Sequence, residues 1–215
     1  MNSTMYFEHV SRKAEEFKEE FPGWDEYYRD TNVEEMPWYE KNLDHDVENE
    51  ITANNLNSGS FLDLGTGSGT QAIQLVKYNF EITGTDISQS AIDKAKKLSS
   101  DVHFMVDNIL NSKIDDKEFD YIFDSGIFYV FDISQRPQYV KQIKRILNDN
   151  GILFLKCMST KEEKLPENGM PHKLSRLEIT DSFNADFDIL RIEDTVFRGT
   201  LEFEPKALFA VLKKK

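Results

Sequence analysis

A short apolar run followed by three closely spaced glycines restricts the fold of this chain more than any other segment. Residues 61–64 supply the apolar run, and the glycines are Gly65, Gly67 and Gly69. Apolar residues then recur at helical spacing over 70–76. The pattern predicts a β-strand, a glycine turn and the start of an α-helix. Such a turn lets backbone N–H groups approach a ligand, and the helix N-terminus favours a polar or anionic group, so we expect a nucleoside-containing cofactor here.

Strand and helix patterns alternate from this segment to the C-terminus. The predicted strands are 60–64, 80–86, 102–106, 119–124, 152–157, 187–197 and 206–212. The predicted helices are 69–77, 88–98, 137–148 and 176–184, with two more upstream at 3–20 and 40–56. Asn150 and Gly151 favour a turn between the third of these helices and its strand. The sequence predicts an α/β fold: a Rossmann-like, doubly wound, mostly parallel seven-stranded sheet with helices on both faces and an N-terminal helical lid.

Length and composition set further limits. A chain of 215 residues predicts one domain over 1–215, with an N-terminal helical lid at 1–57 and a Rossmann-like core at 58–215. The net charge of −13 argues against nonspecific binding of nucleic acid. The single cysteine, Cys157, allows no intramolecular disulfide, and no apolar run approaches the roughly 18 residues of a membrane span. No signal-peptide pattern is recognised, so we expect a cytoplasmic protein that is a monomer or a homodimer, without membrane partners or a dedicated metal site.

The glycine segment alone fits two cofactors. Gly67, Gly69 and Ala72 also satisfy the loose Gly-x-Gly-x-x-Ala pattern of dinucleotide-binding proteins. Asp86, at the end of the second predicted strand, can accept hydrogen bonds from both ribose hydroxyls of either cofactor. These residues therefore leave a nicotinamide-dependent oxidoreductase as an alternative.

Acidic residues stand at the ends of the first three predicted strands. Asp63 lies two residues before the first glycine, where it can meet an ammonium group of a ligand. Asp86 ends the second strand, and Asp107 with Asn108 ends the third, where they can receive an exocyclic amine. An acid at each strand end favours a cofactor that carries an ammonium group, a ribose and an adenine.

Together these segments resemble the class I S-adenosylmethionine-dependent methyltransferases. Motif I appears as Asp63-Leu-Gly-Thr-Gly-Ser-Gly69, the ribose-binding acid as Asp86, the adenine-contacting acid as Asp107, and motif IV as residues 119–126. The resemblance implies S-adenosyl-L-methionine as cofactor. It also implies cofactor contacts by Asp63, Leu64, Gly65, Thr66, Gly67, Gly69, Asp86, Ile87, Asp107, Asn108, Ile109, Ser125 and Gly126.

Two further segments resemble the thiopurine and tellurite-resistance methyltransferases, which act on small molecules. The aromatic segment with Trp24, Tyr28 and Trp38 is similar to the lid of that group, so these three residues are expected to cover the cofactor. Residues 169–179 resemble the group's Gly-Pro-Pro-x-x-x-Ser-x-x-Glu segment, with His172 in place of the second proline. The segment at 22–38 is expected to be a mobile loop that becomes ordered over the cofactor.

Methyl transfer from a sulfonium is an in-line displacement, for which alignment of the two reactants supplies much of the rate. We expect a small-molecule acceptor such as a thiol or an oxyanion, which needs little activation. Where a proton must be removed, the candidates are Asp124, Tyr129 and His172, of which Tyr129 and His172 are the predicted catalytic residues. A non-catalytic module that only binds S-adenosylmethionine remains a further alternative.

Overall fold

A computed structural model describes residues 23–165 and 171–215 of the chain. The helix predicted at 3–20 lies outside these residues. Among the described residues, the strands are β1 (Ser60–Leu64), β2 (Glu81–Asp86), β3 (His103–Val106), β4 (Phe119–Ser125), β5 (Leu147–Met158), β6 (Phe187–Val196) and β7 (Lys206–Lys214). The α-helices are α2 (Trp24–Asp30), α3 (His45–Ala53), α4 (Thr70–Leu75), α5 (Gln89–Leu98), α6 (Arg136–Ile146) and α7 (Arg176–Phe183).

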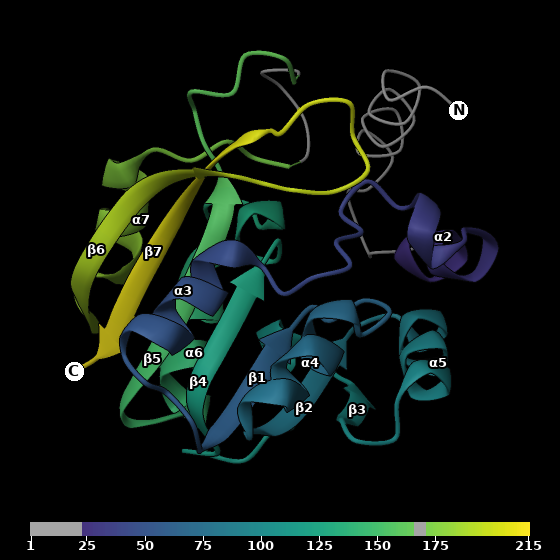
Figure 1. Cartoon of the computed structure of the whole chain (residues 1–215). Coiled ribbons are helices and arrows are strands. Elements are labelled where there is room, and N and C mark those ends of the chain that lie inside the picture. Colours follow the sequence, from purple (N-terminus) through teal and green to yellow (C-terminus); the bar gives the residue numbers. More distant parts are fainter. Residues whose placement is uncertain (1–22, 166–170) are drawn as a thin grey trace.

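The seven strands form one sheet in the order β3-β2-β1-β4-β5-β7-β6 (Figure 1). Neighbouring strands from β3 to β5 are parallel, and β7 runs antiparallel to both β5 and β6. The order reverses at β1, where β2 and β4 lie on opposite sides of the strand. Ligands of such sheets bind at the carboxyl ends of the strands beside this switch point, so the topology places a site at the ends of β1, β2 and β4.

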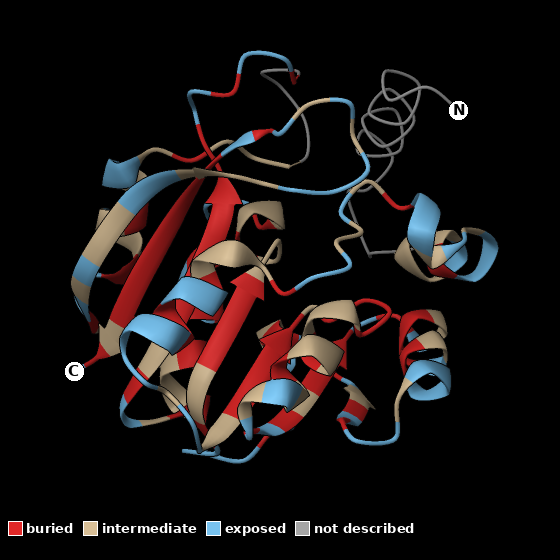
Figure 2. Ribbon diagram, in the orientation of Figure 1, coloured by how far each residue is buried: buried red, intermediate tan, exposed pale blue. Residues whose placement is uncertain are grey.

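Helices cover both faces of the sheet, as predicted. On one face, Val47 of α3, Leu75 of α4 and Ile92 of α5 pack with the phenylalanines of the strands. On the other face, Tyr139 of α6 and Phe183 of α7 pack on the remaining inward side chains. The inner strands are buried along most of their length, whereas the edge strands β3 and β6 and the outer faces of the helices are more exposed (Figure 2). The predicted fold class is therefore confirmed.

Serine side chains cap the first turns of α5 and α7. The Ser88 hydroxyl accepts a hydrogen bond from the backbone N–H of Ala91, at 3.1 Å, where α5 begins. Ser175 and Glu178 form a capping box at the start of α7. Within the described residues, no helix is both long enough and apolar enough to cross a bilayer.

Local structure differs from the prediction at two places. The segment at 22–38 was predicted as a loop, but α2 forms within it because Gly23 stands at the helix N-cap rather than inside the helix. The predicted turn at Asn150 and Gly151 lies within β5, which already begins at Leu147 because that residue pairs with Phe119 of β4. Asn150 takes a positive φ of 65° there and absorbs the irregularity in the pairing.

Candidate functional site

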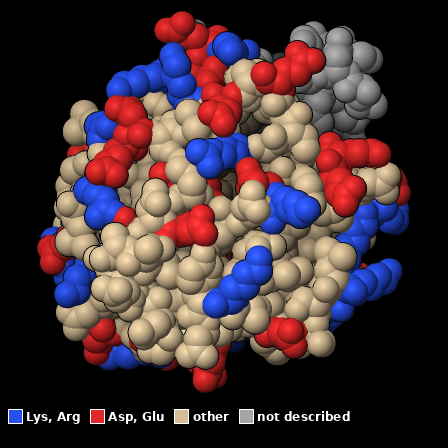
Figure 3. Space-filling view, viewed as in Figure 1, with Lys and Arg blue, Asp and Glu red and all other residues tan. Residues whose placement is uncertain are grey.

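A cavity of about 260 Å³ opens at the carboxyl ends of β1, β2 and β4. The face shown in Figure 3 is hollowed in this region. Sixteen of the predicted site residues line the cavity: Trp24, Tyr28, Trp38, Asp63, Leu64, Gly65, Thr66, Gly67, Asp86, Ile87, Asp107, Asn108, Ile109, Ser125, Gly126 and Tyr129. Gly69 and His172 do not line it.

The glycine turn has a backbone conformation that residues with a side chain rarely adopt. Gly65, Gly67 and Gly69 have φ values of 72°, 53° and 82°, in the left-handed region that favours glycine. A Cβ at Gly67 would lie 2.5 Å from the Tyr28 hydroxyl, and one at Gly69 would lie 2.6 Å from the ring of Phe104. Gly69 therefore serves the start of α4 and its packing, whereas Gly67 faces the cavity.

Two of the strand-end acids are held by the glycine turn itself. The Asp63 carboxylate accepts hydrogen bonds from the Thr66 hydroxyl at 2.6 Å and from the backbone N–H of Ala72 at 3.1 Å. The Asp86 carboxylate accepts from the backbone N–H groups of Gly67 at 3.0 Å and Ser88 at 2.9 Å. Burial raises the pKa of Asp63 and of Asp86 to about 6, and the hydrogen bonds offset part of this shift.

Asp107 has one carboxylate oxygen in use and one without a partner. Its Oδ1 accepts a hydrogen bond from the backbone N–H of Lys113 at 3.0 Å. Its Oδ2 is buried and has no partner among the described residues. A buried acceptor of this kind suits an amine donor from a ligand. The pocket wall therefore fits an adenine-containing cofactor, because an exocyclic amine would satisfy the orphaned oxygen.

The N-terminal segment, residues 23–38, covers this part of the cavity and is here called the cap segment. Trp24, Tyr27, Tyr28 and Trp38 pack together, with ring centroids 5.5–6.5 Å apart. Polar contacts anchor α2 to α5. Asp25 accepts hydrogen bonds from the Ser88 hydroxyl at 2.9 Å and from the Ser90 backbone at 2.8 Å. Sequence reasoning did not single out Asp25, because its partners lie 63 and 65 residues away.

The other end of the cavity has largely apolar walls, formed by Tyr129, Met158, Phe197, Leu201 and Pro205; we call this end the acceptor chamber. Apart from Tyr129, no motif in the sequence points to these residues.

The β6–β7 loop covers the acceptor chamber and is joined to the cap segment. The Thr200 backbone N–H donates to the carbonyl of Pro37 at 3.2 Å, and its hydroxyl donates to the carbonyl of Met36 at 3.0 Å. The loop and the cap segment thus form a roof over this end of the cavity.

The three candidate bases differ in their surroundings. Asp124 is fully buried, accepts three backbone N–H bonds and the Tyr139 hydroxyl at 2.5 Å, and does not line the cavity. His172 lies with its Nε2 atom 3.3 Å from the exposed Asp132 carboxylate, also outside the cavity lining. Tyr129 lines the cavity, and burial raises the pKa of its hydroxyl. Of the three, geometry leaves Tyr129 in reach of a substrate.

The cavity lies at the switch point of an α/β sheet and is lined by a glycine turn and by acidic residues at the strand ends. This arrangement is typical of enzymes that bind a nucleoside-containing cofactor. The family model described as "Methyltransferase domain" matches residues 56–192. The match covers more than half of the chain, which therefore belongs to this family of methyltransferase domains.

Among proteins of similar sequence, human EEF1A lysine methyltransferase 2 is 36% identical over 121 residues, which cover 50% of this chain and 51% of that protein. The Danio rerio protein of the same name is 25% identical over 152 residues, covering 64% of this chain and 65% of that protein. The chain therefore spans about half to two thirds of the length of these relatives.

Solved structures share the fold at low sequence identity. One, described as "Conversion of a Disulfide Bond into a Thioacetal Group during Echinomycin Biosynthesis", has a TM-score of 0.78 at 19% identity and covers 90% of this chain and 92% of that chain. A SAM-dependent methyltransferase from Anabaena variabilis has a TM-score of 0.71 at 20% identity, with coverage of 90% and 94%. These likenesses concern the fold alone.

Proposed function

We propose that this protein transfers a methyl group from S-adenosylmethionine to a small molecule held in the acceptor chamber. The observation that carries the proposal is the roof over that chamber, closed by the two hydrogen bonds from Thr200 to the cap segment. A small acceptor fits beneath such a roof, whereas a folded protein would have to insert one side chain through the remaining opening.

The cofactor would be held by the residues at the ends of β1, β2 and β3. Asp63 would meet its ammonium group, Asp86 its ribose hydroxyls and Asp107 its adenine amine; all three line the cavity, and the buried Oδ2 atom of Asp107 supports the last of these roles. Gly65 and Gly67 leave room for the ligand at the turn, and Trp24, Tyr28 and Trp38 cover it. When bound, S-adenosylmethionine supplies a methyl group already activated on a sulfonium.

The chain itself contributes position and the exclusion of water. Alignment of two reactants can lower a barrier by about 7–11 kcal/mol, which lessens the need for a strong base when the acceptor is a thiolate or an oxyanion. Tyr129 stands in the chamber wall with its hydroxyl near Gly126, where a Cβ would lie 3.2 Å from the oxygen. A tyrosine hydroxyl is protonated at neutral pH, and burial raises its pKa further, so this hydroxyl can orient an acceptor by donating a hydrogen bond.

A second candidate acceptor is a lysine side chain of a protein. It is favoured by the relatives named EEF1A lysine methyltransferase 2, which match at 25–36% identity over part of their length. A lysine side chain is long and narrow enough to reach a chamber through an opening in its roof.

Labelled S-adenosylmethionine separates the two candidates. The purified protein is incubated with tritiated cofactor and either a panel of small thiols, oxyanions and amines or a protein extract. The Asp86→Ala variant serves as the control for cofactor-dependent labelling. Label on a small molecule supports the proposal. Label confined to lysines of proteins would refute the small-molecule acceptor and support the second candidate.

A further inference from the structure

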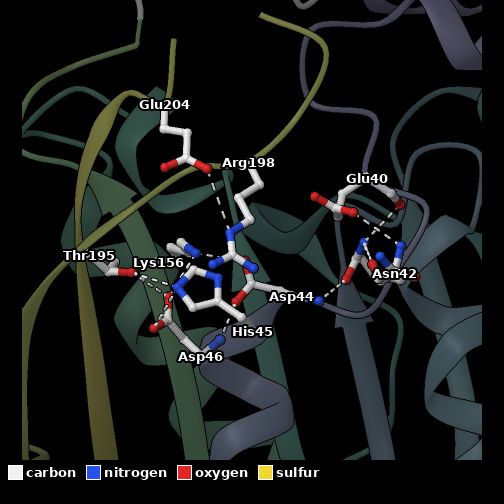
Figure 4. Close-up of polar contacts among 10 residues, drawn as sticks. Glu40, Asn42, Asp44, His45, Asp46, Lys156, Thr195, Arg198 and Glu204 are labelled. Carbon is white, nitrogen blue, oxygen red and sulfur yellow. Dashed lines mark hydrogen bonds and ion pairs between the residues drawn. The ribbon is translucent and has the colours of Figure 1, made fainter.

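A fully buried lysine lies behind the acceptor chamber. Lys156 of β5 pairs in register with Ser125 of β4, and its side chain is 0% exposed. Its Nζ atom lies 2.7 Å from a carboxylate oxygen of Asp44 and 2.7 Å from one of Asp46 (Figure 4). Asp44, His45 and Asp46 place their ligand atoms within 4.8 Å of one another, as a metal site would. The ammonium group already occupies the position between the two carboxylates, so we assign no metal to them.

One side of this network fixes the start of α3. Asp44 is the N-cap of α3, and its carboxylate accepts a hydrogen bond from the backbone N–H of Asp46 at 3.0 Å. The backbone N–H of Asp44 donates to the Gln71 side chain of α4 at 2.7 Å. Both Asp44 and Gln71 line the cavity. Lys156 thereby holds the segment that leads from the cap to α3.

The other side of the network fixes the end of β6. The Asp46 carboxylate also accepts a hydrogen bond from the Thr195 hydroxyl at 2.8 Å. The Lys156 ammonium lies 5.4 Å from the centre of the Phe197 ring, within the range of a cation–π contact. Phe197 in turn packs edge-on against Tyr129 with ring centroids 6.0 Å apart. The root of the β6–β7 loop is thus tied to the same ammonium group.

We propose that Lys156 is a positioning residue that sets the wall of the acceptor chamber. It does not line the cavity, but it joins Asp44 on one side to Phe197 on the other, and both of these do. Removal of its charge would take the ammonium group from between the carboxylates of Asp44 and Asp46 and would abolish the cation–π contact with Phe197. The start of α3 and the root of the β6–β7 loop would then lose their common attachment to β5. Within the described part of the chain, the side chains of Asp63, Asp86 and Asp107 make no hydrogen bond or ion pair with Lys156, Asp44 or Asp46, so the effect should fall mainly on the acceptor side. The proposal rests on the proposed function in that it takes this chamber to hold the acceptor.

The first test needs no acceptor. Lys156→Met keeps the length of the side chain and removes its charge, and Lys161→Met is the matched control, since Lys161 is an exposed partner of Asp194. Hydrogen exchange is measured with S-adenosylhomocysteine bound, and its affinity is measured by calorimetry. In Lys156→Met we expect the amides of Phe197 and Thr200 to exchange at least about tenfold faster, with a cofactor Kd within about twofold of wild type. Unchanged exchange, or an equal loss of protection in the strand-end turns at Gly67, would overturn the proposal.

The second test uses thiophenol as acceptor. Lys156→Met should raise the KM for thiophenol about tenfold, because the chamber wall has moved, and leave the KM for S-adenosylmethionine unchanged. A purely structural loss would lower kcat alone, by reducing the active fraction, and would refute a positioning role. If the wild type methylates no thiol, the small-acceptor proposal fails for this class, while the exchange measurement still decides the role of Lys156. If Lys156→Met does not fold, the double variant with Asp46→Asn carries both measurements, because it has one uncompensated carboxylate fewer.

Discussion

Replacement of Asp86 by asparagine should stabilise the cofactor-free protein at neutral pH while it weakens cofactor binding. Burial raises the pKa of this carboxyl from its ordinary value of about 3.9 to about 6. Between these values the folded protein binds more protons than the unfolded chain, so stability falls as the pH rises through that window. The buried charge therefore opposes folding at pH 7 and above, and an uncharged asparagine removes that penalty.

The magnitude follows from the pKa shift. A difference of about two pKa units corresponds to about 3 kcal/mol of unfavourable free energy once the pH exceeds the folded-state value. Asparagine can accept only one of the two backbone hydrogen bonds from Gly67 and Ser88, which costs about 0.5–1.5 kcal/mol. We therefore expect Asp86→Asn to be more stable than wild type by roughly 1.5–2.5 kcal/mol at pH 8 and slightly less stable at pH 4.

Urea unfolding of both proteins at pH 4 and at pH 8 tests this directly. The other buried acids are present in both proteins, so most of their titration cancels in the difference. The Asp86 charge also raises the pKa of Asp63, so its removal acts on stability at neutral pH in the same direction. Asp93→Asn, at an exposed position of α5, is the matched control. Calorimetry with S-adenosylhomocysteine should show at least about tenfold weaker binding to Asp86→Asn. A stability difference that stays the same at both pH values would refute the account of Asp86 as a desolvated carboxylate.

Three further perturbations test the cavity. Gly67→Val should abolish binding of S-adenosylhomocysteine, because the φ of 53° and the nearby Tyr28 hydroxyl leave no room for a side chain, as calorimetry can check. The turn lies at the cavity and outside the sheet, so circular dichroism should still show a folded protein. Tyr129→Phe should lower kcat about tenfold without changing the Kd of S-adenosylhomocysteine, since one hydrogen bond to the acceptor is lost. Gly199→Ala should separate the loop from the Pro37 carbonyl and raise the KM for the acceptor, measured by steady-state kinetics. Residues 23–38 should exchange more slowly when S-adenosylhomocysteine is bound; equal protection with and without it would indicate a static cap.

The sheet and its cofactor end could be predicted because their signals are local. β1, β3 and β4 are short segments rich in apolar residues, and each of β1, β2 and β3 has an acid at or next to its carboxyl end, namely Asp63, Asp86 and Asp107. Glycines at positive φ mark the turn without reference to any distant segment. The parallel topology then brings the strand ends to one edge of the sheet.

Local sequence patterns predicted the wrong secondary structure where contacts with distant residues determine it. Helix α2 buries Tyr28 and no other residue, so it has no apolar stripe that would predict a helix. It is held instead by the contacts of Asp25 with Ser88 and Ser90 on α5. Asn150 and Gly151 have the composition of a turn and lie in the irregularity of β5, between Leu147, which pairs with Phe119, and Ile152, which pairs with Tyr121.

The acceptor chamber also depends on contacts between residues that are distant in the sequence. Its walls come from the cap segment, the turn after β4, the end of β5 and the β6–β7 loop, which are far apart in the sequence. Phe197 and Met158 lie in or next to predicted strands, so the sequence alone suggests only that they are core residues. Lys156 is a charged residue within an otherwise apolar predicted strand, and its partners Asp44 and Asp46 lie 112 and 110 residues earlier in the chain. The cofactor-binding end of the cavity can therefore be predicted from contiguous motifs. The walls of the acceptor chamber cannot, because only the fold brings their side chains together.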